Sequence, residues 1–123
     1  MIVGVGVDLC EVARFARVVE RWGDRVLGRL FTEREREAGE GRRGAERLAA
    51  RFAAKEAARK ALGAAEAGEW RDVEVVSDRA TGAPSIAFHG RARRRAEVLA
   101  VRQSHVSLTH QAGLAVAVVV LEA

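Results

Sequence analysis

The stretch from residue 45 to residue 63 reads AERLAARFAAKEAARKALG, and it decides the fold. At about 100° per residue its alanines fall on one wide helical face, and Gly63 stands where a helix would stop. The alanines of this face are Ala49, Ala50, Ala53, Ala54, Ala57, Ala58 and Ala61. The pattern predicts a helix over residues 45–62 whose small side chains press closely against a sheet or another helix.

The opposite side of this helix mixes large apolar and charged side chains: Leu48, Arg51, Phe52, Lys55, Glu56, Arg59 and Lys60. A helix that only met solvent there would be more uniformly polar. Lys55 and Lys60 are the only lysines of the chain, and they flank Glu56. Because lysine can lose its proton where arginine cannot, the pattern favours a phosphate-handling cluster. The alternatives are a solvated face and an ordinary ion pair between Glu56 and Lys60, worth about 0.3 kcal/mol.

Residues 2 to 9 alternate as a strand, with Gly4, Gly6 and Asp8 on one face. Glycines inside a strand mark the close approach either of a ligand or of a packed helix, and both interpretations stay open. Mg²⁺ takes one or two carboxylates together with waters and substrate phosphates. Asp8 and Glu56 are therefore the right kind of pair for a magnesium site, although their separation in sequence does not show that they meet.

Residues 11 to 22 predict an amphipathic helix with an inward stripe made of Val12, Phe15, Val19 and Trp22. Arg14, Arg17 and Arg21 recur three and four residues apart, so they line its exposed side. This basic side is either simply solvated or a docking surface for an acidic partner.

The rest of the chain completes a single α+β domain over residues 1–123. The other expected elements are a short helix from a capping box at Thr32 and Glu35, a loop over 39–44, strands over 72–77 and 85–88 around a turn with Gly82 and Pro84, a helix over 91–102, a strand over 105–109, a turn over 110–113 and a strand over 114–121. The last strand is apolar on both faces, which is typical of a central strand covered on both sides.

Bulk composition limits the cellular setting. No apolar run approaches the ~20 residues of a membrane span, and the chain begins without a basic start or a cleavage site, so we expect neither a membrane segment nor a signal peptide. The single Cys10 excludes an intramolecular disulfide and agrees with a reducing compartment, so we place the protein in the cytoplasm. The net charge of +4 favours acidic partners, which are nucleic acid, phosphates or an acidic protein.

Three segments, in order, resemble one known family over essentially the whole chain. They are Gly4-Val-Gly-Val-Asp8 followed by Glu11 to Phe15, the central stretch Arg51 to Gly63, and His105-Val-Ser-Leu-Thr-His110. The family is that of the holo-acyl-carrier-protein synthases, the small-type 4'-phosphopantetheinyl transferases.

The resemblance implies a fold, an assembly and a reaction. The fold is an antiparallel sheet packed on a long helix, and the assembly is a homotrimer with active sites between neighbouring subunits. The reaction transfers 4'-phosphopantetheine from coenzyme A to a serine of apo-acyl-carrier protein and releases adenosine 3',5'-bisphosphate. It depends on Mg²⁺, with Mn²⁺ as the alternative, and serves fatty-acid synthesis or, alternatively, polyketide synthesis.

Carried over residue by residue, the resemblance makes Asp8 and Glu56 the metal ligands, Glu56 the acceptor of the serine proton and Lys60 the partner of the leaving phosphate. The residues matched to coenzyme A are Arg51, Phe52, Lys55, Lys60, Gly63, Pro84, His105 and Thr109. Those matched to carrier-protein docking are Arg14, Arg17 and Arg21. The sequence departs from the family at Ala83, where a lysine is frequent before the proline, and at residues 111–113, where an aromatic residue is frequent.

Two other classes of function compete with this interpretation. A basic nucleic-acid-binding module without catalysis would explain the charge, but it leaves Asp8 and Glu56 unexplained and has few aromatic residues for base stacking. A trimeric scaffold that only binds carrier proteins would tolerate the loss of both carboxylates. We therefore expect an enzyme, with no nucleic acid and no membrane among its partners.

Overall fold

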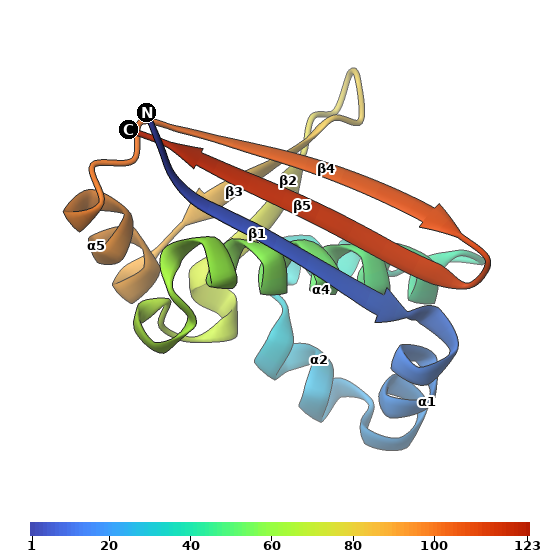
Figure 1. Ribbon diagram of the computed structural model, residues 1–123. Coiled ribbons are helices and arrows are strands. Elements are labelled where there is room, and N and C mark those ends of the chain that lie inside the picture. The colour runs from blue at the N-terminus through green and yellow to red at the C-terminus, as the bar shows by residue number, and fades with distance from the viewer.

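The computed structural model describes residues 1–123 and is built around one three-stranded antiparallel sheet (Figure 1). Its strand order is β1-β5-β4, with β1 at Ile2–Glu11, β4 at Gln103–Gln111 and β5 at Leu114–Glu122. The two ends of the chain meet at one end of this sheet, where the backbone N–H of Ala123 donates to the carbonyl of Met1 at 2.8 Å. The predicted strands are confirmed, and β1, β4 and β5 extend beyond the expected 2–9, 105–109 and 114–121 by two, four and one residues.

The long helix α4, Gly44–Leu62, packs along one face of the sheet, and Gly63 ends it with φ of 95°. Its alanine face is buried, as predicted. A Cβ added at Gly4 or Gly6 would overlap the backbone carbonyl oxygens of Ala61 and Ala57. The glycines of β1 therefore make room for a packed helix, and not for a ligand, because only a bare backbone can approach the helix this closely.

Three helices lie between β1 and α4 in sequence: α1 at Val12–Trp22, α2 at Asp24–Leu30 and α3 at Glu33–Glu37. The capping box of α3 is confirmed, since Thr32 and Glu35 exchange both side-chain-to-backbone hydrogen bonds. The prediction that Trp22 belongs to the buried stripe of α1 is wrong: it is 49% exposed, with the Arg21 guanidinium 5.1 Å from its ring centre. Trp22 is the last residue of the helix, and the chain turns at Gly23 immediately after it, so the Trp22 side chain does not pack in the core. Helix α2 was not predicted.

A second, two-stranded sheet pairs β2, Val73–Ser77, with β3, Pro84–Phe88. Single 3₁₀ turns precede it at Ala64–Glu66 and Trp70–Asp72, and α5 follows at Gly90–Val98. Helix α5 is four residues shorter at its end than expected, because Ala100 takes φ of 58° and turns the chain into β4. The predicted turn over 110–113 is also shorter: β4 runs through His110, and only Ala112 and Gly113 form the turn, with φ of 53° and 77°.

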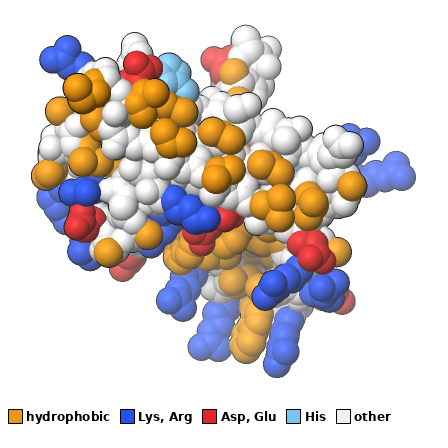
Figure 2. All heavy atoms as spheres, in the orientation of Figure 1, with side chains coloured by type: hydrophobic (Ala, Val, Ile, Leu, Met, Phe, Trp, Pro, Cys, Tyr) orange, Lys and Arg blue, Asp and Glu red, His pale blue; other side chains and the backbone are white.

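Strand β5 is central, as predicted, but only one of its faces is covered within the chain. Helix α4 covers the inner face, while the outer face carries Val5, Val7 and Leu9, which are 60%, 55% and 57% exposed. Figure 2 shows hydrophobic side chains spread over this face, with lysine and arginine side chains projecting from the helices beside it. The α+β class is confirmed. No helix of the structure has the length and apolar character that a membrane crossing requires.

Candidate functional site

Three of the predicted site residues meet where β1 crosses α4. The ammonium Nζ of Lys60 lies 3.1 Å from Asp8 Oδ1 and also donates to the carbonyl of Val7. Glu56 lies one helical turn before Lys60 on the same side of α4, but Lys60 forms its ion pair with Asp8 and not with Glu56. The structure thus brings Asp8, Glu56 and Lys60 into one cluster, which we call the carboxylate cluster.

The electrostatics of the carboxylate cluster suit a cation. Burial, and then the nearby charge of Asp8, raise the pKa of Glu56 above its usual value, against the opposing effect of Arg59 and Lys60. A divalent ion between the two carboxylates would remove this repulsion. No group of three or more His, Cys, Asp or Glu side chains is placed to hold a metal ion. Two carboxylates still suffice for Mg²⁺, which completes its shell with water and phosphate oxygens.

A cavity of about 470 Å³ lies on the other side of α4, between the β2–β3 hairpin and β4. Of the predicted residues it brings together Arg51 and Pro84, and it is also lined by Arg47, Ser77 and His110. One terminal nitrogen of Arg51 donates to Ser77 Oγ at 2.9 Å, while its Nε is buried without a partner. We call this space the arginine cavity. Two guanidinium groups at its wall make it suited to an anionic ligand.

The carboxylate cluster and the arginine cavity lie on opposite sides of one helix. Lys60 follows Arg51 by nine residues, which at about 100° per residue is two and a half turns. Asp8 belongs to the edge strand β1, and His110 to the opposite edge strand β4. Within a single chain the two places therefore do not join into one site.

Lys55 does not lie in either place. Its side chain is fully buried, and Nζ donates to Glu35 Oε1 at 2.7 Å and to the carbonyl of Val73 at 2.5 Å. Burial lowers the pKa of Lys55, with Glu35 opposing. This placement offers the Lys55 ammonium no phosphate contact. It makes Lys55 part of the core, where it links α4 to α3 and β2.

Phe52 and Gly63 also lie away from the arginine cavity. The Phe52 ring stacks on Trp70 with ring centres 5.3 Å apart and meets Phe15 at 5.7 Å. It lines an apolar cavity of about 420 Å³ along α1, together with Leu9, Cys10, Arg14, Phe15 and Val18. Gly63 forms the end of α4, three residues beyond Lys60.

His105 and Thr109 point to the outer face of the sheet, where they pair in register with Val120 and Val116. His105 Nε2 lies 2.6 Å from Glu122 Oε1, and His105 does not line the arginine cavity. His110 points to the inner face because neighbouring residues of a strand alternate, and it reaches the arginine cavity. Sequence reasoning selected His105 and missed His110. The available signal was that His110 shares the face of Val106 and Leu108, out of phase with His105, Ser107 and Thr109.

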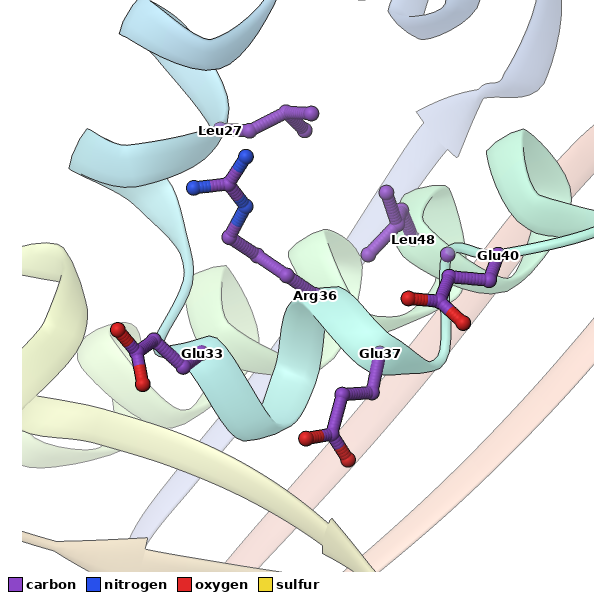
Figure 3. Close-up of a pocket in the computed structure, with 7 residues that line it drawn as sticks. Leu27, Glu33, Arg36, Glu37, Glu40 and Leu48 are labelled. Carbon is purple, nitrogen blue, oxygen red and sulfur yellow. The ribbon is translucent and has the colours of Figure 1, made fainter.

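The three predicted docking arginines, Arg14, Arg17 and Arg21, are all exposed on α1, and none forms an ion pair within the chain. Of the three, Arg14 also lines the apolar cavity that Phe52 lines. A further cavity of about 450 Å³ lies between α2, α3 and α4. Its carboxylates Glu33, Glu37 and Glu40 point in different directions (Figure 3), and Arg36 is paired with Asp24 at 2.6 Å, so it does not form a convergent site.

Comparisons with known proteins agree on one family. Residues 4–119 match the 4'-phosphopantetheinyl transferase superfamily. The holo-[acyl-carrier-protein] synthase of Streptomyces coelicolor is 50% identical over 123 residues, with 98% of each chain covered. The crystal structure of that of Neisseria meningitidis has a TM-score of 0.88 at 29% identity and covers 100% of both chains. The crystal structure of that of Helicobacter pylori, in complex with coenzyme A, has a TM-score of 0.83 at 26% identity and covers 96% of this chain and 99% of that one.

Proposed function

The chain belongs to the 4'-phosphopantetheinyl transferase superfamily, and from this premise we propose that it is a holo-[acyl-carrier-protein] synthase. It transfers 4'-phosphopantetheine from coenzyme A to a serine of apo-acyl-carrier protein. Relatives of the same name match nearly its whole length, and one solved relative holds coenzyme A. The observation in this chain that carries the proposal is the meeting of Asp8, Glu56 and Lys60 at the crossing of β1 and α4. We place the reaction in the cytoplasm because the chain has one cysteine and no disulfide.

In the proposed reaction, the serine oxygen bonds to the β-phosphorus of coenzyme A, and the bond from that phosphorus to the adenosine 3',5'-bisphosphate oxygen breaks. Glu56 takes the serine proton as the general base of the step. Lys60, half-exposed, lies beside the cluster and stabilises the negative charge on the leaving phosphate. A magnesium ion held by Asp8 and Glu56, with manganese as the alternative, would neutralise the pyrophosphate. Asp8 also holds Lys60 in place.

Coenzyme A has its nucleotide end in the arginine cavity, where Arg51, Pro84 and His110 line the wall. The cations suit its phosphates, and the cavity is roughly the size of the sites that hold small ligands. This cavity and the carboxylate cluster lie on opposite sides of α4. The coenzyme therefore extends from the arginine cavity of one copy to the carboxylate cluster of a neighbour.

A homotrimer meets this requirement. The outer face of the sheet leaves Val5, Val7, Leu9 and Val118 exposed in a contiguous apolar strip. Soluble monomers rarely expose a large apolar patch, so this face is suited to contact with other copies of the chain. His105 and Thr109 border the strip, and they would lie at the contact between copies.

The carrier protein docks on α1. The exposed side of this helix presents Arg14, Arg17 and Arg21, none of which has an acidic partner in the chain, and Arg14 also lines the apolar cavity of Phe15 and Phe52. Such a surface fits an acidic helical protein that also offers apolar side chains, and its affinity falls with salt. Carriers of fatty-acid synthesis are the first candidates, followed by those of polyketide synthesis.

Intact-mass spectrometry tests the proposal. An apo-acyl-carrier protein incubated with the chain, coenzyme A and magnesium should gain the mass of one phosphopantetheine arm, and a chelator should prevent the gain. Asp8→Ala should abolish the gain while circular dichroism stays unchanged, whereas Asp24→Ala, which removes an exposed aspartate, should not. Absence of any gain with several carriers, from folded protein and with metal present, would overturn the proposal.

A further inference from the structure

His110 occupies an unusual position, because it lines two cavities at once. On one side it faces the arginine cavity with Arg47, Arg51 and Pro84. On the other it lines a smaller cavity of about 220 Å³, formed with Val12, Glu46, the 111–113 turn and Leu114. The ring therefore lies between the two cavities. The residue that fixes its orientation decides which edge of the ring contacts a ligand.

Glu46 is the acidic side chain that faces this ring. It lies in the first turn of α4, and its Oε1 is 3.7 Å from Nδ1 of His110. We propose that Glu46 is the positioning residue of the coenzyme site: it holds the Nδ1 edge of His110 and so directs the Nε2 edge into the arginine cavity. This inference rests on the proposed binding of coenzyme A in that cavity.

The charges around the ring support this role. Glu46 is the one acidic group lining either cavity, and Arg47 and Arg51 are the only other charged ones. A histidine with protons on both nitrogens can donate one hydrogen bond to a carboxylate and another to a phosphate. The Glu46 carboxylate is therefore the one group at this wall that can attract an Nδ1–H of the ring, since arginines offer donors only.

The backbone fixes the position of the His110 Cα and Cβ atoms but not the rotation of the imidazole ring. His110 pairs with the buried Ala115 in register, and the turn that follows is tied to α1 by the hydrogen bond from Val12 N–H to the Gly113 carbonyl at 2.9 Å. The side-chain torsion of a histidine ring is broad and roughly two-fold, so the backbone alone does not choose which nitrogen faces the cavity. The carboxylate of Glu46 makes that choice.

The inference is tested with Glu46→Ala, compared with Glu97→Ala, which removes an exposed glutamate of α5 that is paired only with Arg93. Calorimetric titration with coenzyme A should give a Kd about fivefold higher for Glu46→Ala than for the native protein, and KM should rise by about the same factor while kcat is kept. Glu46→Gln, which keeps an acceptor, should recover part of the loss. In the background of His110→Ala the Glu46→Ala change should have no further effect.

Long-range ¹H–¹⁵N spectra of the imidazole provide a reading that does not depend on coenzyme A. In the native protein the neutral ring of His110 should favour the tautomer with its proton on Nδ1, which faces Glu46, and Glu46→Ala should lose this preference. Unchanged ring spectra, or equal effects of Glu46→Ala with and without His110, would overturn the inference. If the chain fails to modify any carrier but the ring spectra change as expected, the positioning of His110 stands and the proposed reaction falls.

Discussion

The buried pair of Lys55 and Glu35 gives the sharpest prediction of stability. Both side chains are fully buried, and their charged atoms are 2.7 Å apart. Lys55→Met keeps the length of the side chain and removes its charge. The carboxylate of Glu35 would then stay in the core without a counter-charge, and we expect the folded state to lose much of its stability.

The magnitude follows from what Glu35 retains. Removing one partner of a buried ion pair costs about 3–5 kcal/mol. In this pair Glu35 would keep two backbone donors, from Thr32 N–H at 2.9 Å and Val75 N–H at 3.0 Å, which places the expected loss near the lower end. The native ammonium is itself costly to bury, as its lowered pKa indicates, and Lys55→Met removes that cost. We therefore expect a loss of about 3 kcal/mol, a large part of the ~5–15 kcal/mol of a typical domain.

Urea unfolding followed by the fluorescence of Trp22 and Trp70 measures this loss. The protomer concentration must be held constant, because self-association adds to apparent stability. The double variant Lys55→Met with Glu35→Gln is the matched control. It removes both charges and keeps one acceptor oxygen, so one of the two backbone donors, Thr32 N–H or Val75 N–H, keeps its partner while the other faces the amide NH2. It should therefore recover part of the loss.

Two outcomes would refute this reasoning. One is a loss below about 1 kcal/mol for Lys55→Met, which is the range of an exposed ion pair. The other is a double variant that is less stable than the single one. If Lys55 contacts the coenzyme, as the sequence predicted, Lys55→Met would instead keep its stability and raise the KM of coenzyme A.

Three further predictions concern the carboxylate cluster, the docking helix and the outer face of the sheet. Because burial and Asp8 raise the pKa of Glu56, the folded state binds a proton more readily than the unfolded state, and at pH 7 the ionised carboxylate lowers stability. Glu56→Gln should thus raise Tm at pH 7 and lose that advantage near pH 4. It should also lower kcat about 10²-fold or more. An unchanged Tm at pH 7 would contradict the raised pKa of Glu56. Arg14→Glu with Arg21→Glu should raise the KM of the carrier about tenfold at low salt and leave that of coenzyme A unchanged, and equal effects on both would argue against docking there. Val7→Arg should convert the proposed homotrimer to monomers in light scattering and remove turnover, whereas a trimer that persists would exclude this face.

Helix α4 could be predicted from the sequence because its signals are local and agree with one another. The alanine face, the apolar positions and the stop at Gly63 all indicate the same element, and it begins within one residue of the expected start. Helix α2 gave no such signal, because Gly28 interrupts a short run with few apolar residues. Trp22 has the spacing of a core residue, and its exposure depends on where the chain turns after Gly23, which the spacing does not determine.

The structure brings some of the predicted site residues together and separates others, and the separated ones show what the sequence could not supply. Lys55 shares a helical arc with Arg51 and Glu56, and a helical projection treats the three alike. The fold separates them, because α3 and β2 cover the arc at Lys55 and leave it open at Glu56. The same holds for His105 and His110, whose roles differ only through the face of β4 that each occupies. Which face is covered is a tertiary property, so no local pattern could supply it.

The pattern Gly4-x-Gly6-x-Asp8 ties the fold to the chemistry. Neither glycine touches the proposed site, yet a Cβ at either position would overlap the backbone of α4, so any larger residue would push β1 away from the helix. Asp8 is the next residue on the same face, and its 3.1 Å ion pair with Lys60 requires that the strand stay close. The short side chain of Asp8 can reach Glu56 and Lys60 only if the backbones of β1 and α4 lie close together. The glycines are therefore needed for the carboxylate cluster to form, because they set the distance at which Asp8 meets Glu56 and Lys60.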